Sequence, residues 1–117
     1  MVATAAGYTP DRGDVVWLEF TPQAGHEQGG TRPALVLSPA NYNAKSGLML
    51  CCPVTNQAKN YPFEVPVVAG SNSGVTGVAL ADQIRCVDFG ARRANKFGFV
   101  TPQCVQDVSV KAKTLLP

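Results

Sequence analysis

The sequence predicts a mainly β fold, a compact barrel-like sheet with a few helical segments and an α-helix at the C-terminus. Short apolar runs rich in β-branched and aromatic residues recur at close spacing through most of the chain. Segments rich in Gly, Pro and Asn separate these runs. Residues 101–117 change to a helical spacing of apolar side chains. Short strands at close intervals are typical of a small closed sheet.

Seven apolar runs have the length and composition of strands. They comprise residues 14–20, 33–38, 48–54, 63–67, 75–81, 83–88 and 97–100. Pro66 lies inside the fourth run and cannot donate a ladder hydrogen bond, which predicts an edge position for that strand. Between the second and third runs, residues 41–43 indicate a turn or a helical turn.

The C-terminal segment has the signals of a helix start. Thr101 is a candidate N-cap and Pro102 occupies the first helical position. The apolar residues that recur at helical spacing are Val105, Val108, Ala112 and Leu115. Because valine loses side-chain freedom in a helix, tertiary packing must stabilise this one.

The 117 residues predict a single domain, with residues 1–8 as a flexible tail. The tail lacks the basic and apolar regions of a signal peptide, and no apolar run is long enough to span a membrane. We therefore expect a cytoplasmic protein without a membrane partner. A formal charge of +2 is too small for a non-specific nucleic-acid binder, so any such site must be local.

The four cysteines match neither a zinc site nor a disulfide framework in their spacing. They are Cys51, Cys52, Cys86 and Cys104. Three of them lie in apolar stretches, where a reduced cysteine packs as a small apolar side chain. We interpret them as packing residues.

The glycine-rich segment 25–33 combines side chains suited to phosphoryl transfer. His26 exchanges protons near neutral pH, Glu27 can accept a proton or orient the imidazole, and Arg32 carries a planar cation that matches phosphate. Alternatively, Glu27 caps backbone N–H groups and Arg32 forms a surface ion pair with Glu27 or Asp82.

One histidine and scattered carboxylates do not build a zinc or two-metal site, so we expect no metal and no cofactor. Without a metal, the 2′-hydroxyl of RNA is the available nucleophile, which limits nuclease activity to RNA. Such a site needs a base for the 2′-hydroxyl and a cation for the phosphorane.

An ordered set of motifs resembles the MazF/PemK toxin endoribonucleases. The matching segments are residues 12–17, 25–28, 31–38, 53–55, 60–65 and 77–85. The resemblance implies an SH3-like β-barrel and a dimeric, ribosome-independent RNase. Such an enzyme cuts single-stranded RNA at a short sequence and leaves a 2′,3′-cyclic phosphate and a 5′-hydroxyl.

The resemblance also assigns the catalytic residues. The family's arginine falls on Arg32, where it stabilises charge, and its threonine falls on Thr55, where it positions a phosphate oxygen. Without the resemblance, a strand-end hydroxyl bonded to the backbone is the better interpretation of Thr55. His26 and Glu27 are both candidates for proton transfer. In a PemK-type branch a catalytic arginine stands where this chain has Leu80, so the mechanism here depends on Arg32 and Thr55.

We expect RNA to be bound by polar residues of the loops and strand ends. The predicted set is Gln28, Asn43, Gln57, Lys59, Asp82, Gln83 and Arg85. Asp82 is equally interpreted as a turn residue. The candidates for base stacking are Tyr42, Tyr61 and Phe63, although core packing is the better interpretation of Phe63.

The resemblance implies a cognate antitoxin with an acidic, partly disordered tail, a homodimer, and contact with DNA only through the antitoxin complex. Two other classes of function remain open. A non-enzymatic toxin of the same fold acts on a protein target such as DNA gyrase, and an SH3-like module binds peptides. Fold alone does not separate these classes.

Overall fold

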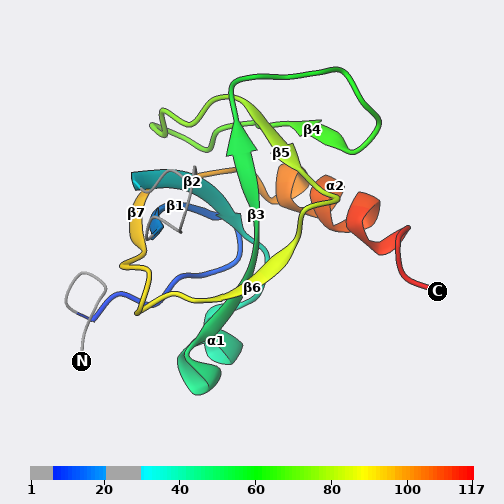
Figure 1. The fold of residues 1–117 in the computed structure, drawn as a ribbon. Coiled ribbons are helices and arrows are strands. Elements are labelled where there is room, and N and C mark those ends of the chain that lie inside the picture. Colours follow the sequence, from blue (N-terminus) through cyan, green and yellow to red (C-terminus); the bar gives the residue numbers. More distant parts are fainter. Residues whose placement is uncertain (1–6, 21–29) are drawn as a thin grey trace, which may run out of the picture.

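Seven strands form one antiparallel sheet in the computed structural model, which describes residues 7–20 and 30–117 (Figure 1). The strands are β1 Asp14–Phe20, β2 Gly30–Val36, β3 Leu48–Thr55, β4 Glu64–Pro66, β5 Val78–Leu80, β6 Arg85–Asp88 and β7 Asn95–Phe99. Their order is β4-β5-β3-β2-β1-β7, and β6 pairs with the first half of β3. The long strand β3 therefore connects three neighbours, β2, β5 and β6.

The two ends of this strand order meet and close the sheet. Ala69, just after β4, forms an antiparallel bridge with Val100, just after β7. Two backbone bonds flank the bridge, from the Gly70 N–H to the Phe99 carbonyl and from the Thr101 N–H to the Val68 carbonyl, each 2.9 Å long. The segments that follow β4 and β7 make this closure, so β4 itself still lies at the end of the strand order. The predicted mainly β, barrel-like fold is thus confirmed.

The central strands bury side chains on both faces. Val15, Leu35 and Cys52 belong to an apolar cluster beneath the C-terminal helix. Their neighbours Val16 and Val36 belong to a second cluster on the other face. Because successive side chains alternate across a strand, a strand that is covered on both faces has a nearly continuous apolar sequence.

The predicted strands are confirmed with shifted boundaries. The second begins at Gly30 rather than residue 33, because Gly30 and Arg32 pair with Phe20 and Leu18 on β1. The fourth strand shortens to Glu64–Pro66 and lies at one end of the strand order, which confirms the edge position predicted from Pro66.

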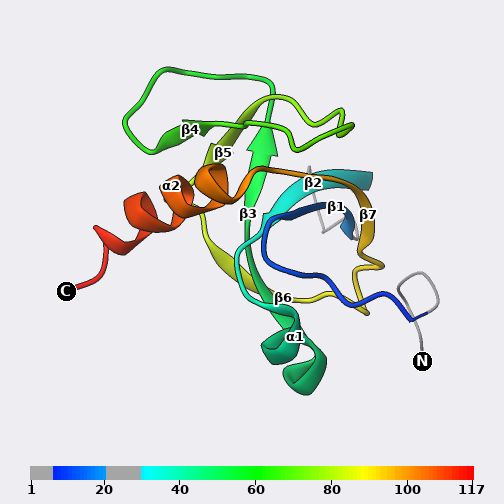
Figure 2. The same ribbon diagram turned by 180° about the vertical axis from the view of Figure 1, so that it is seen from behind.

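Two helices pack against the barrel (Figures 1 and 2). Helix α1, Ala40–Ser46, extends the turn predicted at residues 41–43 to a full helix and ends at Gly47 in the left-handed conformation, φ 75°. Helix α2, Pro102–Lys113, begins as predicted, and the Thr101 side chain accepts a hydrogen bond from the Cys104 N–H.

The apolar face of α2 is only partly as predicted. Val105, Val108 and Ala112 are buried. Leu115 lies beyond the helix end and is 51% exposed, so its predicted place on the buried face is wrong. Neither described helix is long and apolar enough to span a membrane.

The cysteines are all free thiols. Cys51, Cys52 and Cys104 are buried, whereas Cys86 is exposed on β6. Burial raises the pKa of the Cys51 thiol to about 11 and that of Cys52 to about 12. These two thiols stay neutral at physiological pH, which fits their interpretation as packing residues.

Candidate active site

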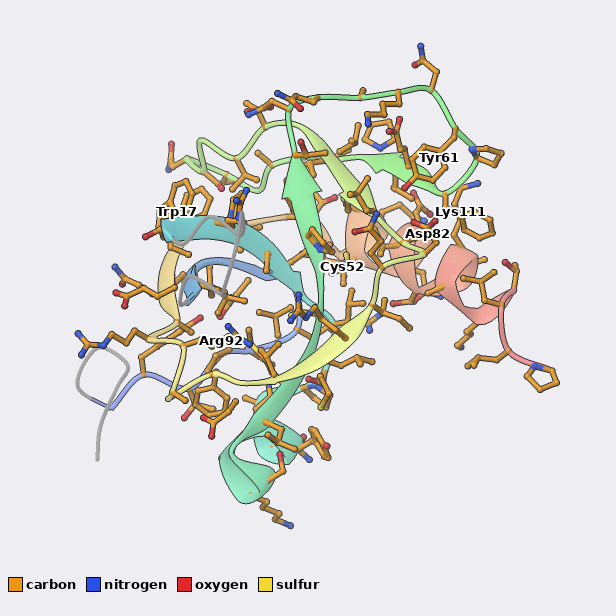
Figure 3. The ribbon with its side chains drawn as sticks, in the orientation of Figure 1. Trp17, Cys52, Tyr61, Asp82, Arg92 and Lys111 are labelled. Atoms are coloured by element: carbon orange, nitrogen blue, oxygen red, sulfur yellow. The ribbon has the colours of Figure 1, made fainter. Side chains whose placement is uncertain are left out.

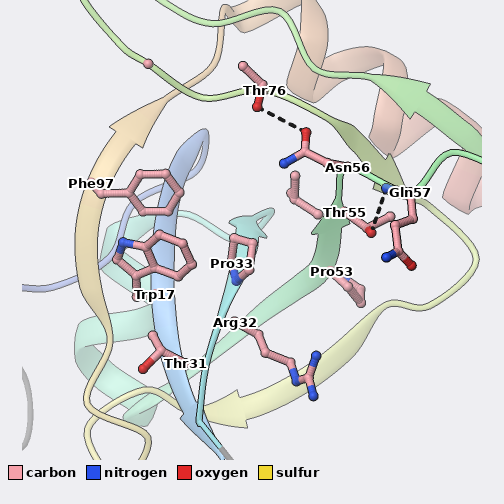
Figure 4. A pocket seen from close by; sticks show the side chains of 12 residues that line it. Trp17, Thr31, Arg32, Pro33, Pro53, Thr55, Asn56, Gln57, Thr76 and Phe97 are labelled. Carbon is pink, nitrogen blue, oxygen red and sulfur yellow. Dashed lines mark hydrogen bonds between the residues drawn. The ribbon is translucent and has the colours of Figure 1, made fainter.

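A pocket of about 570 Å³ opens where strands β1, β2, β3 and β7 lie side by side (Figure 4). It is lined by Trp17, Thr31, Arg32, Pro33, Pro53, Val54, Thr55, Asn56, Gln57, Gly74, Thr76 and Phe97. The two residues with predicted catalytic roles, Arg32 and Thr55, are both in this set. The strands therefore bring together the arginine and threonine that are 23 positions apart in the sequence.

Arg32 lies on β2 with its side chain exposed at the pocket. Its backbone pairs with Leu18 of β1, so a central strand of the sheet fixes its position. Within residues 7–20 and 30–117, Arg32 makes no ion pair. Its alternative partner Asp82 instead accepts a hydrogen bond from the Tyr61 hydroxyl at 2.9 Å. The guanidinium is thus not held by Asp82.

Thr55 is the last residue of β3, and its side chain makes one backbone contact. The Gln57 N–H donates to Thr55 Oγ1 at 3.1 Å. This is the backbone bond that the alternative interpretation of Thr55 expects. Because the hydroxyl acts only as the acceptor in it, the hydroxyl proton can still be donated to a group in the pocket.

An aromatic pair forms one side of the pocket, and the sequence did not indicate it. The rings of Trp17 on β1 and Phe97 on β7 stack with centroids 4.4 Å apart and an angle of 20°. Trp17 lies on the same face of β1 as the buried Val15, and its ring is 37% exposed at the pocket.

Asn56 and Thr76 lie across the pocket from this pair (Figure 4). The Thr76 hydroxyl donates to Asn56 Oδ1 at 3.1 Å. This bond fixes the amide so that its nitrogen points toward the aromatic side of the pocket (Figure 4). Gln57 is the one described member of the predicted RNA-binding set that lines the pocket.

Other predicted RNA-binding residues lie elsewhere. Lys59, Asp82, Gln83 and Arg85 are exposed but do not line the pocket. Asp82 is part of a turn in which the Gln83 N–H donates to the Leu80 carbonyl, as the turn interpretation expects. Figure 3 shows Tyr61 and Asp82 on the side of the barrel near α2, away from Trp17. His26, Glu27 and Gln28 lie outside the described residues.

Asn43 is a correction to the predicted RNA-binding set. Its side chain is fully buried in α1, where its amide nitrogen donates to the carbonyls of Pro10 and Ser38. Its amide oxygen accepts a hydrogen bond from the Ser38 hydroxyl at 2.6 Å. Because every polar atom of this amide is used inside the fold, Asn43 has a structural role.

The stacking candidates also change. Tyr42 is exposed on α1, Tyr61 bonds Asp82, and Phe63 packs against the apolar cluster beneath α2. None of the three lines the pocket. The structure describes no group of three His, Cys, Asp or Glu side chains arranged to hold a metal ion.

Comparisons with known proteins identify the family of this chain. Residues 11–116 match the family described as PemK-like, MazF-like toxin of type II toxin-antitoxin system. The chain is 49% identical over 109 residues to the endoribonuclease toxin MazF of Escherichia coli K12, covering 93% of this chain and 96% of that protein. It is 35% identical over 109 residues to the endoribonuclease PemK of E. coli, covering 91% of this chain and 81% of that protein.

Solved structures show the same fold. The MazE-MazF crystal structure (Form-II) from Deinococcus radiodurans superposes with a TM-score of 0.83 at 54% identity, covering 93% of this chain and 96% of that one. MazF (Form-I) from the same organism gives a TM-score of 0.79 at 54% identity, covering 93% and 97%. The chain therefore belongs to the family of PemK-like, MazF-like toxins of type II toxin-antitoxin systems.

Proposed function

We propose that this chain is a toxin endoribonuclease that cuts single-stranded RNA at a short sequence and so stops translation and growth. The observation that carries the proposal is the convergence of Arg32 and Thr55 on one open pocket beside a stacked aromatic pair. A cation, a hydroxyl donor and a stacking surface are the groups that a cleaved RNA phosphate and its neighbouring bases require. The named endoribonuclease relatives support the same conclusion.

The proposed reaction is attack by the 2′-hydroxyl on the adjacent phosphorus. The new bond joins the 2′-oxygen to phosphorus, and the bond to the 5′-oxygen breaks. The products are a 2′,3′-cyclic phosphate and a 5′-hydroxyl, which takes up a proton. No metal or cofactor takes part in this scheme, since the pocket's own cation offsets the developing charge.

Arg32 stabilises the negative charge on the phosphorane oxygens. A guanidinium stays protonated at any working pH, so Arg32 acts through charge and hydrogen bonds rather than as a base. Thr55 donates its hydroxyl proton to a phosphate oxygen, and the Gln57 N–H holds that hydroxyl in place. Gln57 itself contacts the RNA at the pocket.

His26 and Glu27 are the proposed proton-transfer residues. They precede Arg32 by six and five positions. An imidazole with its ordinary pKa of about 6.5 can take the 2′-hydroxyl proton near neutral pH, and a carboxylate can do so or orient the imidazole. Gln28 in the same segment contributes to RNA binding in this proposal.

Residues outside the pocket contact the longer RNA chain. Lys59 and Arg85 are exposed cations that suit phosphates away from the cut, and such contacts add affinity without sequence choice. Asp82 and Gln83, in the turn before β6, are proposed as contacts to exposed bases. The site acts on RNA in the cytoplasm.

The proposed partners are a cognate antitoxin and a second copy of this chain. The solved MazE-MazF complexes support the antitoxin, whose acidic tail would cover the cation of the pocket and the RNA path. The homodimer is what the resemblance to the family implies. Contact with DNA is proposed only through the antitoxin complex. A monomer in sedimentation velocity at micromolar concentration would contradict the dimer.

The test is incubation of pure protein with a defined long single-stranded RNA in excess EDTA, followed by mapping of the ends. We expect cuts at one recurring short sequence, with cyclic phosphate ends. Cleavage should be lost in Arg32→Ala. Of His26→Ala and Glu27→Gln, the variant that removes the general base should lower the cleavage rate about 10²- to 10⁴-fold. Intact RNA across salt and pH, with folded protein, would overturn the proposal and favour a toxin that acts on a protein target such as DNA gyrase.

A further inference from the structure

The pocket contains a partly exposed aromatic stacking surface. Trp17 on β1 and Phe97 on β7 are each 37% exposed. The neighbours of Trp17 on β1, Val16 and Leu18, are buried in the core. The Trp17 and Phe97 rings stack on each other at the pocket rim. Exposed aromatic rings at a hollow next to a cation are typical of surfaces that bind single-stranded nucleic acid.

The position of this surface follows from the strand register. Trp17 pairs with Pro33 across β1 and β2, one residue from Arg32. Because successive side chains alternate across a strand, the Trp17 ring and the Arg32 guanidinium leave the sheet on opposite faces, and both line the same pocket. A nucleotide bound at the phosphate site would bring a neighbouring base to the pocket.

The facing wall supplies a directed hydrogen-bond donor. Because Asn56 Oδ1 accepts from the Thr76 hydroxyl, the amide nitrogen is the atom presented to the pocket (Figure 4). An amide N–H₂ pairs with an acceptor on a base edge, such as a ring nitrogen or a carbonyl oxygen. A fixed donor opposite a flat apolar wall matches a planar ligand with a polar edge.

We propose that this part of the pocket is a nucleobase subsite. The base lies against the Trp17 and Phe97 pair, and Asn56 donates to an acceptor atom on its edge. Thr76 is a positioning residue, because it orients the amide without touching the base. This inference rests on the proposed function, since it names the site for a base of the RNA that is cut.

A peptide segment of an antitoxin is the other macromolecule that could enter this pocket. An acidic, apolar peptide would use the cation and the aromatic wall. It would not require a donor held in one orientation by a second side chain. The Asn56 and Thr76 arrangement therefore favours the base.

The chain provides its own reporter, because Trp17 is its one tryptophan. The first measurement is Trp17 fluorescence of the full chain during titration with a short single-stranded RNA that carries the mapped cleavage sequence. A deoxyribose 5′ to the cut removes the nucleophile, so binding is measured without cleavage. We expect a saturable quench of the tryptophan emission.

An abasic scan of the same oligonucleotide locates the base. An abasic nucleotide at one position beside the cut should abolish the quench and weaken binding about 5- to 150-fold, the range for loss of one stacked base. Abasic nucleotides further away should preserve the quench. If RNA binds and is cut while the emission does not change, or if no abasic position removes the quench, the subsite is overturned and the proposed nuclease stands.

Variants test the two walls separately. Trp17→Ala should weaken RNA binding within the same range, and Trp17→Phe, which keeps a flat ring, should restore most of it. Asn56→Asp replaces the donor with an acceptor and should shift the preferred base at the scanned position. Thr76→Val should reduce discrimination between bases at that position while cleavage of the best sequence persists. Tyr42→Ala, an exposed aromatic on α1, is the matched control.

The outcomes separate the inference from the function on which it rests. If Trp17→Ala and Asn56→Asp leave RNA affinity and base preference unchanged but weaken antitoxin binding, the pocket serves the antitoxin and the subsite is overturned. If the unmodified chain neither binds nor cuts RNA of varied sequence, the proposed function fails and the subsite fails with it.

Discussion

The Gln57 backbone N–H donates to the Thr55 hydroxyl at 3.1 Å, where β3 ends and the chain turns away from the barrel. This bond fixes the rotamer of Thr55 at the rim of the pocket. It also leaves the hydroxyl proton for a ligand. The threonine thus combines a local structural bond with a donor directed to the site.

Thr55→Val tests that donor, since valine has nearly the same shape and lacks the hydroxyl. Loss of a hydrogen bond to a charged phosphate oxygen costs about 1.5–3 kcal/mol, so the cleavage rate should fall roughly 10- to 150-fold. Thr55→Ser keeps the hydroxyl and should retain most of the rate. Equal losses in both variants, measured under single-turnover conditions, would contradict the assignment.

Arg32→Ala should abolish most of the cleavage while the protein stays folded, because the side chain is exposed and makes no described ion pair. Removal of one group that stabilises transition-state charge costs about 10²- to 10³-fold in rate. Arg32→Lys keeps the charge but lacks the planar guanidinium, so its cleavage rate should lie between those of the parent protein and Arg32→Ala. Lys111→Ala, an exposed cation on α2, is the control. A change of less than threefold in Arg32→Ala would remove Arg32 from the mechanism.

Much of the fold was predictable because its signals are local. Short apolar runs rich in β-branched and aromatic residues predicted the strands, and Thr101 with Pro102 predicted the start of α2. The end of α2 was harder to predict, because Leu115 continues the helical spacing of apolar residues although the helix ends two residues earlier. Closure through Ala69 and Val100 depends on a long-range pairing that no local pattern encodes.

The candidate site was also predictable only in part. Arg32 and Thr55 were assigned through a resemblance in ordered motifs, whereas the Trp17 and Phe97 pair was missed because it joins strands 80 positions apart in the sequence. Asn43 was assigned to RNA because a polar residue in a predicted turn is expected to be exposed. Its burial follows from carbonyls that converge only in the folded chain.

Asn43→Ala should therefore destabilise the fold rather than change RNA recognition. The variant leaves the Pro10 and Ser38 carbonyls without their buried donor, which should lower the free energy of unfolding by about 2–4 kcal/mol. Asn41→Ala, at an exposed position of the same helix, should change it by less than about 1 kcal/mol. Urea denaturation measures both. Unchanged stability with altered cleavage sites in Asn43→Ala would restore the original assignment.

The four thiols should differ in reactivity according to burial. Brief treatment of the native protein with iodoacetamide near pH 8 should alkylate Cys86 alone, because the other three cysteines are buried and the raised pKa values of Cys51 and Cys52 keep those thiols neutral. In denaturant all four should react. Mass spectrometry of the intact protein and its peptides gives the count and positions, and rapid native labelling of Cys51 or Cys52 would contradict the described core.

Tyr8 should contribute to stability in a pH-dependent way. Its hydroxyl donates to Asp14 Oδ2 at 2.7 Å, and the pKa of Tyr8 is raised by partial burial and by this bond to the carboxylate. The folded state therefore holds the phenol proton more tightly than the unfolded chain does. That contribution is fully present below the ordinary tyrosine pKa of about 10 and is lost as the pH rises above it.

Tyr8→Phe should lower the free energy of unfolding by about 1 kcal/mol at pH 7 and flatten its decline between pH 9.5 and 11, relative to the parent protein. Urea denaturation across this pH range measures the difference, and parallel declines in the two proteins would show that Tyr8 ionises alike in the folded and unfolded states.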